Sequence, residues 1–273
     1  METDRSEKHS EIAQKNGNTD KPKGARQILQ EQIETGIGEY NRAGFSLFLS
    51  AFAAGLEIGF SILLMGSLFT LFQDQISESG LHLILSLSYS LGFVFVMLGR
   101  SELFTEHTAL AILPVLNRQE SLSKLIKVWV LVYLGNIIGG YIFSFIVVYL
   151  GPQIGFISTK AFHHLATGLI AHSGQTIFFS GILAGWMMGL LGWLWTSAQE
   201  TIGRIFIIIM ITSVIALGGL HHCIIGSIEV FSGLLTSQSI SADDYFKFQG
   251  WATLGNALGG VVFVAVLKFS HAK

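Results

Sequence analysis

Apolar and polar residues alternate along this chain in long blocks. Six stretches of about 20 residues or more are almost wholly apolar, and short polar connections separate them. They cover roughly 46–72, 82–113, 127–150, 177–197, 205–235 and 248–268. A helix needs about 20 apolar residues to cross the hydrocarbon core of a bilayer. The pattern therefore predicts an all-α membrane protein with six transmembrane helices.

The residues before the first apolar block predict a polar tail followed by a short helix. Residues 1–27 are rich in Lys, Glu, Ser and Asn, which is typical of a disordered tail. Between 28 and 42, apolar side chains recur at spacings of four, four and three, at Leu29, Ile33, Ile37 and Tyr40. This spacing predicts an amphipathic helix. It could lie on the membrane surface, plug the cytoplasmic mouth of a pore, or rest on the first span as a linker.

Composition supports a membrane protein and excludes several other classes. The mean hydropathy is +0.57 and only 12% of residues are charged, against about 25% in soluble domains. The net charge is −2, and without a basic patch nothing points to nucleic acid. The single cysteine, Cys223, excludes an intrachain disulfide and argues against a cysteine metal cluster. The polar first forty residues do not resemble a secretory signal.

Lysine and arginine are distributed unevenly between the connections. Thirteen of the sixteen lie before the first span, around the second and fourth connections, and after the last span. The other connections hold only Lys160 and Lys247, and Arg100 lies inside a span. Cytoplasmic connections carry the excess of positive residues. We therefore expect a multi-pass protein of the cell (inner) membrane with both termini in the cytoplasm and the 151–176 connection outside.

Short strings recur in the same order in the two halves of the chain. Ala-Gly-x-x-x-Gly begins at Ala54 and again at Ala184, and Leu-Gly-Asn-x-x-Gly-Gly begins at Leu134 and again at Leu254. Each half contains three predicted spans, so the second half enters the membrane from the opposite side. This arrangement predicts an inverted-topology repeat.

The repeat also sets the expected domain boundaries and the position of the pore. We expect a cytoplasmic tail over 1–42, containing the amphipathic helix, and a six-span channel domain over 43–273. Its two repeats cover about 46–150 and 177–268. Inverted repeats place the permeation site near the midplane at broken helices. The second and fifth spans are long and carry polar residues, so they are predicted to be broken.

The two predicted breaks carry the candidate chemistry. The second span contains Gly-Arg-Ser-Glu-Leu-Phe-Thr-Glu-His at 99–107, and the fifth contains Gly-Gly-Leu-His-His-Cys at 218–223. Ionisable groups inside spans are costly, so they are functional or paired by default. Arg100 could pair with Glu57 or Glu102 and lock the broken helix, or it could attract an anion. Glu102 is expected to cap backbone amides at the break, since a carboxylate repels an anion.

Two adjacent histidines, His221 and His222, stand in the fifth span. Neighbouring residues on a helix point about 100° apart, so only one should line a pore unless the helix breaks between them. Imidazole suits anion transport because its unperturbed pKa, about 6.5, lets it change charge near physiological pH. A protonated ring attracts an anion, and a shared proton lets a weak acid cross as a neutral molecule.

At these residues the chain resembles the formate/nitrite transporter family over about 44–269. The strings that carry the resemblance are Glu102-Leu103-Phe104-Thr105, Tyr133-Leu134-Gly135-Asn136, Gly219-Leu220-His221-His222 and Leu254-Gly255-Asn256. The resemblance implies an aquaporin-like fold and a homopentamer with one pore per subunit. It also implies passage of small monovalent anions such as formate or nitrite, with or without a proton.

The resemblance assigns roles to individual residues. His222 takes the place of the central pore histidine, and Thr105 is the polar residue opposite it. Leu103 and Phe104, at the first break, are also pore candidates. The bulky residues that narrow the pore are Tyr89, Phe93 and Ile215, and the neighbouring histidine, His221, is a further candidate. The expected structural polar residues are Glu102, Arg100, Glu57, Asn136 and Asn256. The chain departs from the family where His221 replaces an acidic residue, and where Gly185 and Gly226 replace asparagines.

Three other functions compete with an anion channel or proton-coupled carrier. A pore for water or small neutral solutes is disfavoured because the doubled Asn-Pro-Ala signature is absent. An intramembrane metalloenzyme is disfavoured because no His-Glu-x-x-His or comparable ligand spacing is present. A non-transporting membrane scaffold remains open. We therefore expect no enzymatic activity, no cofactor and no metal.

Overall fold

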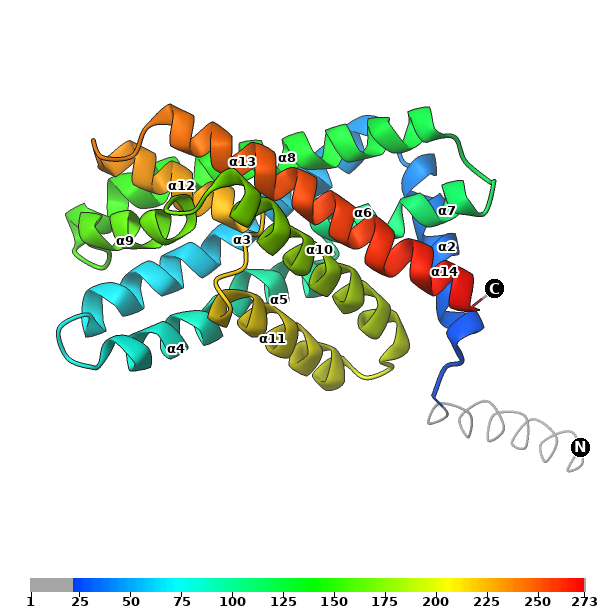
Figure 1. Cartoon of the computed structure of the whole chain (residues 1–273), viewed down its shortest axis with the longest axis horizontal. Helices are drawn as coiled ribbons and strands as arrows, with labels where there is room; N and C mark the ends of the chain where they lie inside the picture. The colour runs from blue at the N-terminus through cyan, green and yellow to red at the C-terminus, as the bar shows by residue number, and fades with distance from the viewer. Residues whose placement is uncertain (1–21, 273) are drawn as a thin grey trace, which may run out of the picture.

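A computed structural model describes residues 22–272, which form helices throughout and contain no strand within that range. In chain order the elements are α2 (Ala25–Asn41), α3 (Gly44–Phe72), α4 (Glu78–Ser88), α5 (Ser90–Gly99), α6 (Phe104–Leu110), α7 (Ile112–Leu116), α8 (Leu122–Ile154), α9 (Thr159–Ile170), α10 (Gly174–Ser197), α11 (Thr201–Leu217), α12 (Ile225–Thr236), α13 (Ala242–Leu258), the π-helix η1 (Gly259–Val266) and α14 (Leu267–Ala272). In Figure 1, α2, α7 and α14 gather at one end of the molecule, and α9 lies at the other.

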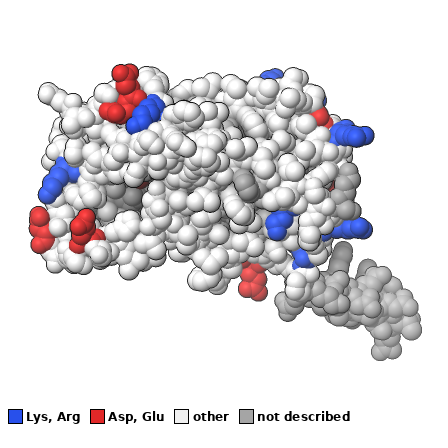
Figure 2. Space-filling model, in the orientation of Figure 1, with Lys and Arg blue, Asp and Glu red and all other residues white. Residues whose placement is uncertain are grey.

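Five helical segments are long and apolar enough to cross a membrane, judged by length and composition. They are Gly44–Phe72, Glu78–Gly99, Leu122–Ile154, Gly174–Ser197 and Ala242–Ala272. Three shorter apolar segments accompany them: Phe104–Leu116, Thr201–Leu217 and Ile225–Thr236. The charged side chains visible in Figure 2 lie mainly toward the two ends of the molecule, with a broad uncharged band between them. Such a band is the surface that lipid can cover without desolvating charge.

Helices are interrupted at both places where the sequence predicts a break. The first interruption covers 100–103, between α5 and α6, and the second covers 218–224, between α11 and α12. Arg100 and Gly219 both have positive φ, at 59° and 58°. A left-handed residue turns the chain out of a right-handed helix. The second and fifth apolar blocks are therefore each built as helix, interruption and helix.

Close helix packing depends on glycines in the repeated strings. A Cβ added to Gly139 would collide with the carbonyl oxygen of Phe52 in α3, and one added to Gly259 would collide with that of Ile182 in α10. Gly135 and Gly255 are equally crowded by the same two partner helices. Close backbone approach supplies van der Waals energy between helices in lipid. These four glycines are therefore helix-packing positions.

The 151–176 connection contains a helix that the sequence did not reveal. Helix α9 packs against α12, with Phe162 and Ala166 fully buried. Ser158 caps its first turn by accepting a hydrogen bond from the amide of Ala161 at 3.3 Å. The helix is too short to give a membrane-spanning signal, so its burial depends on tertiary packing that the local pattern does not encode.

The predicted amphipathic helix is present as α2 and begins at Ala25. Its apolar face, which includes Ile28, Leu29 and Ile33, packs with Leu113 of α7 and with residues of α10 and η1. Of the three placements left open for this helix, the structure does not show the one on the first span, because α2 packs mainly against α7, α10 and α14. The remainder of the expected tail, residues 1–21, lies outside the described residues.

Candidate functional site

One asparagine holds the first interruption in place. The Asn136 side chain, on α8, donates hydrogen bonds from Nδ2 to the carbonyl oxygens of Ala51 and Glu102. Its Oδ1 accepts a hydrogen bond from the amide of Phe104. All three distances are 2.8 Å. Asn136 thus satisfies backbone groups that the interrupted helix leaves without partners.

A second asparagine repeats this arrangement at the second interruption. Asn256, on α13, donates from Nδ2 to the carbonyl oxygens of Gly181 and His221, and its Oδ1 accepts from the amide of Cys223. These three distances are also 2.8 Å. The residue enclosed between the clamped carbonyl and amide is His222 here and Leu103 at the first interruption. The sequence predicted both asparagines as structural polar residues but not this shared clamp.

His222 and Thr105 meet across the two interruptions. Nε2 of His222 lies 2.9 Å from Oγ1 of Thr105, and the amide of Ile224 donates to Nδ1 at 3.3 Å. A backbone amide can only donate, so Nδ1 carries no proton and Nε2–H donates to Thr105. Thr105 is fully buried and His222 is 1% exposed. The Phe93 ring meets the imidazole edge-on, with centroids 5.3 Å apart.

Two cavities approach this contact from opposite sides. The α2-side cavity, of about 480 Å³, is lined by α2, α5, α6 and α10, and the α9-side cavity, of about 300 Å³, by α4, α9 and the second interruption. Tyr89 lines the α9-side cavity, while Val96 and Met97 line the α2-side cavity. Phe93 lies between them along the chain, is fully buried and lines neither. The Phe93–Thr105–His222 contact therefore forms a closed layer, with His222 reaching the α9-side cavity.

The other pore candidates occupy different positions. Leu103 and Ile215 are fully buried and line neither cavity. Phe104 also lines neither cavity, because its ring packs against Trp129 and Tyr133 of α8. The structure thus brings Phe93 and Thr105 to His222 and places the Phe104 ring elsewhere.

His221 points away from the layer. Its Nδ1 lies 2.8 Å from Oγ of Ser180, and its Nε2 lies 3.0 Å from the carbonyl oxygen of Leu169. Both ring nitrogens therefore have partners on neighbouring elements, and the ring also contacts that of His172. Only one of the two adjacent histidines lies in the layer.

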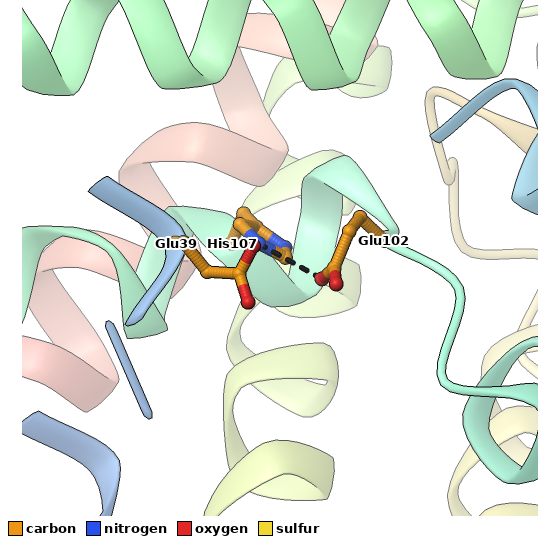
Figure 3. Close-up of side chains that lie close together, drawn as sticks. All are labelled: Glu39, Glu102 and His107. Atoms are coloured by element: carbon orange, nitrogen blue, oxygen red, sulfur yellow. Dashed lines mark ion pairs between the residues drawn. The ribbon is translucent and has the colours of Figure 1, made fainter. Parts of the chain in front are cut away.

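Glu102 belongs to a charged network that joins α2 to the first interruption (Figure 3). Its carboxylate pairs with Arg42, which also pairs with Glu39 at 3.0 Å. Nε2 of His107 lies 3.1 Å from the other Glu102 oxygen, while Nδ1 lies 3.1 Å from the carbonyl oxygen of Leu103. Burial raises the pKa of Glu39, and the neighbouring Glu102 carboxylate acts in the same direction.

The partners expected for Glu102 and Arg100 are wrong. Among the described residues Arg100 forms no ion pair, and its guanidinium lies over the Trp195 ring instead. Glu102 does not cap the break, because Asn136 binds the amide of Phe104. Glu57 lies against Gly99 at the start of the interruption. The true partner of Glu102, Arg42, comes from the segment after α2, which local sequence does not place there.

Three possible metal-ligand atoms of this network lie close enough together to bind one ion. The atoms of Glu39, Glu102 and His107 are within 4.8 Å of one another. Arg42 already pairs with both carboxylates, so their charge is compensated within the protein. We therefore interpret the cluster as an ion-pair network.

Sequence reasoning missed most of the residues that line the α9-side cavity. His82, His164 and His172 line it together with Glu229, beside His222. Two of these histidines belong to the connection that was expected to lie outside the spans. The 151–176 connection contains three histidines, and this high number was the available signal. The local sequence did not show that the connection folds back to the second interruption.

Comparison with known proteins places the chain in a family. The family model described as formate/nitrite transporter matches residues 26–270. The chain is 31% identical over 255 residues to the inner membrane protein YfdC of Escherichia coli (strain K12), covering 92% of this chain and 79% of that protein. A structure described as an FNT family ion channel superposes with a TM-score of 0.80 at 20% identity, covering 89% of this chain and 98% of that one. A pentameric formate channel with formate bound superposes with a TM-score of 0.71 at 22% identity, covering 84% and 97%.

These comparisons confirm the resemblance inferred from the short strings around the two breaks. The family match spans almost all of the described helices, and both solved structures share the fold. Members of this family are transporters and channels and not enzymes, so the family supports the expectation that the chain is not an enzyme. The chain is therefore an integral membrane protein that belongs to the formate/nitrite transporter family.

Proposed function

We propose that this protein is a pore for small monovalent anions such as formate or nitrite, in which the Phe93–Thr105–His222 layer separates two wet cavities. The observation that carries the proposal is the buried 2.9 Å contact between His222 and Thr105, at the meeting of the two interruptions. An anion entering this layer loses water, and such a loss is costly unless donors replace it. Nε2–H of His222 and the Thr105 hydroxyl are the donors available there.

The histidine also gives a route for a proton. A neutral imidazole is too weak an acid to protonate such an anion, so the ring first takes up a second proton, at Nδ1, from the α9-side cavity that it reaches. The imidazolium can then pass its Nε2 proton to the anion of a weak acid, which crosses the apolar layer as the neutral acid and leaves the ring neutral. Support for this step comes from the position of His222, which is buried in the layer and still reaches the α9-side cavity.

We further propose six spans arranged as two inverted three-span repeats over about 46–150 and 177–268. The six 2.8 Å hydrogen bonds of Asn136 and Asn256 support this pairing of the two halves. Each asparagine stands on the third span of its half and bonds both to the first span and to the break. Residues 1–42 are the tail, and 43–273 are the channel domain.

In the proposed orientation both termini face the cytoplasm of the cell, and the protein lies in the inner membrane as a homopentamer. The thirteen-to-two distribution of Lys and Arg supports the orientation. The pentameric formate channel of the same fold supports the assembly. Labelling of single cysteines in sealed right-side-out vesicles tests the orientation, since position 160 should react and position 120 should not.

Anion flux into proteoliposomes tests the function. The purified chain should pass formate and nitrite, and His222→Asn should change the pH dependence of that flux. Water or glycerol flux without anion flux would favour a neutral-solute pore. Absence of all flux from a folded, correctly assembled protein would favour a scaffold. Either result would overturn the proposal.

A further inference from the structure

Two arginines converge on one tryptophan in the α2-side cavity. Cζ of Arg204 lies 4.8 Å from the centroid of the Trp195 ring, and Cζ of Arg100 lies 5.7 Å from the same centroid. All three residues line the α2-side cavity. Arginine stacks well on aromatic faces and keeps its N–H groups free to bind other partners at its edge. The indole therefore holds both guanidinium groups at the wall of one cavity.

The other cations that line this cavity have carboxylate partners. Lys23 pairs with Glu31 at 2.5 Å, and Arg42 pairs with Glu39 and Glu102. In the described part of the chain, neither Arg100 nor Arg204 pairs with a carboxylate.

The hydrogen bonds leave most of the donors of these two arginines available. Arg204 donates from Nε to the carbonyl oxygen of Ala198 at 3.1 Å, which leaves its terminal nitrogens free to turn toward the cavity. Glu106 is the one carboxylate that lines the cavity without an ion pair within residues 22–272. Over its whole lining the cavity has four cations and four glutamates, so the positive charge that an anion meets is the local charge of Arg100 and Arg204 beside Trp195.

The backbone at Arg100 supports a specific role for its side chain. Its φ of 59° and ψ of 36° lie in the left-handed region, which a residue with a Cβ occupies at a cost. Arg118 is the other non-glycine residue with positive φ among those described, and it does not line the α2-side cavity. Glycine would take this conformation without strain, and an arginine stands there instead.

We propose that Arg100 and Arg204, held on Trp195, form a binding site for a planar monovalent oxyanion, such as a carboxylate or nitrite. The paired N–H groups of a guanidinium match two oxygens of one planar anion, which favours such anions over a spherical halide. The site is separate from the His222–Thr105 layer and holds the anion on the α2 side before it enters. This role as a loading site rests on the proposed function, whereas the binding itself does not.

Calorimetric titration of the purified full-length chain with sodium formate, sodium nitrite and sodium chloride tests the binding. Formate and nitrite should bind and chloride should bind more weakly. Arg100→Gln and Arg204→Gln should each raise the Kd for formate by about tenfold, the effect of losing one charge-assisted hydrogen bond. Arg118→Gln removes an arginine of the same backbone conformation outside the cavity and should leave the Kd unchanged.

Glu106→Gln supplies a prediction of the opposite sign. Removing the one unpaired carboxylate should lower the Kd for formate, because repulsion between Glu106 and the anion is lost. Arg100→Lys keeps the charge without the paired N–H geometry and should bind formate more weakly than the wild type but better than Arg100→Gln. Each variant must elute as the wild-type assembly, so that a folding defect is not mistaken for lost binding.

Flux measured with anion supplied on the α2 side separates this site from the pore itself. Arg100→Gln and Arg204→Gln should raise the half-saturating formate concentration and leave the maximal flux near the wild-type value. If the wild type transports formate and both variants keep its Kd and half-saturating concentration, the site is refuted and the proposed function stands. If the wild type binds formate through these arginines but passes no anion, the proposed function fails and the site stands.

Discussion

The two helix interruptions share one backbone arrangement and differ in their side chains. Asn136 and Asn256 make the same three hydrogen bonds, each at 2.8 Å, around Leu103 and His222 respectively. Beside the first interruption stands a charged network, in which Glu102 binds Arg42 and His107. At the second interruption the histidines donate hydrogen bonds to Leu169 and Thr105, and Nδ1 of His221 accepts one from the Ser180 hydroxyl. The scaffold is repeated, whereas the chemistry is not.

The same asymmetry extends to the cavities. The α2-side cavity is lined by lysine, arginine and glutamate side chains. Lysine and arginine keep their positive charge at any physiological pH. The described lining of the α9-side cavity contains no Lys or Arg but contains four histidines and Glu229. Histidine changes charge near neutral pH. The basic groups of one cavity are therefore lysines and arginines with fixed charge, balanced by four glutamates, and the basic groups of the other are histidines.

The shared clamp is the feature whose loss should cost most. Asn136→Leu or Asn256→Leu leaves one buried amide and one carbonyl oxygen of the interruption unsatisfied, at about 1–3 kcal/mol for each group. We expect each substitution to lower stability by about 2–6 kcal/mol and to abolish recovery of the assembled protein. Thermal unfolding followed by size-exclusion chromatography measures this effect.

Asn117→Leu is the matched control for the clamp. Asn117 lies in the turn after α7, and among the described residues its side chain bonds only to Gln119, in an exposed contact. Its replacement should have little effect on stability. If Asn136→Leu were tolerated and Asn256→Leu were not, the two interruptions would not be equivalent.

His222 is the point at which the two interruptions should differ most in function. His222→Asn keeps a hydrogen-bond donor for Thr105 but removes the titrating group. We expect formate flux at acid pH to fall by about a hundredfold, the lower end of what a positioned proton donor contributes, and the pH dependence to flatten. Stopped-flow measurement with a pH-sensitive dye inside proteoliposomes detects both changes.

His221→Asn is the control for this experiment. Its ring bonds to Ser180 and Leu169 outside the layer, so the pH profile should stay that of the wild type. Equal effects of the two substitutions would show that the layer does not depend on one imidazole. An unchanged pH profile in both would leave selection to size and dipoles alone.

The packing glycines test whether the two halves are equally close-packed. Gly139→Leu and Gly259→Leu each place a side chain against a carbonyl oxygen of the facing helix. Overpacking of this kind costs about 1–3 kcal/mol, and both variants should show a lower unfolding temperature and less intact oligomer. Gly250→Leu is the control, since a Cβ there meets nothing within 4 Å. Wild-type stability of both variants would show that these are not contact points.

Local sequence carried more information about the helices than about their partners. The apolar blocks and the glycines near Arg100 and His221 were enough to place the long apolar helices and the two interruptions, because both depend on residues close in sequence, but they did not reveal α9. The partner of Glu102 could not be predicted, since Arg42 lies sixty residues away and reaches it only after α2 docks. The resemblance indicated that His222 faces Thr105, whereas the Asn256 clamp that fixes the ring's position needed the tertiary structure.

The smallest effect is expected in the α9-side cavity, at His164. Its ring stacks on Phe69 with centroids 4.4 Å apart, and burial lowers its pKa, an effect that Glu78 opposes and that His163, His82 and Lys160 reinforce. Because its folded-state pKa lies below the usual value, His164 is neutral at pH 7.5 and gains charge only in acid. His164→Gln should therefore leave formate flux unchanged at pH 7.5 and reduce it by about twofold at acid pH, since one partly solvated charge contributes well under 1 kcal/mol. His271→Gln is the control, because His271 lies in α14, does not line the cavity and is not among the groups that shift the pKa of His164. A reduction at pH 7.5 as large as that in acid would mean that His164 acts through packing and not through charge, and the contrast between a fixed and a titrating cavity would then lose its support.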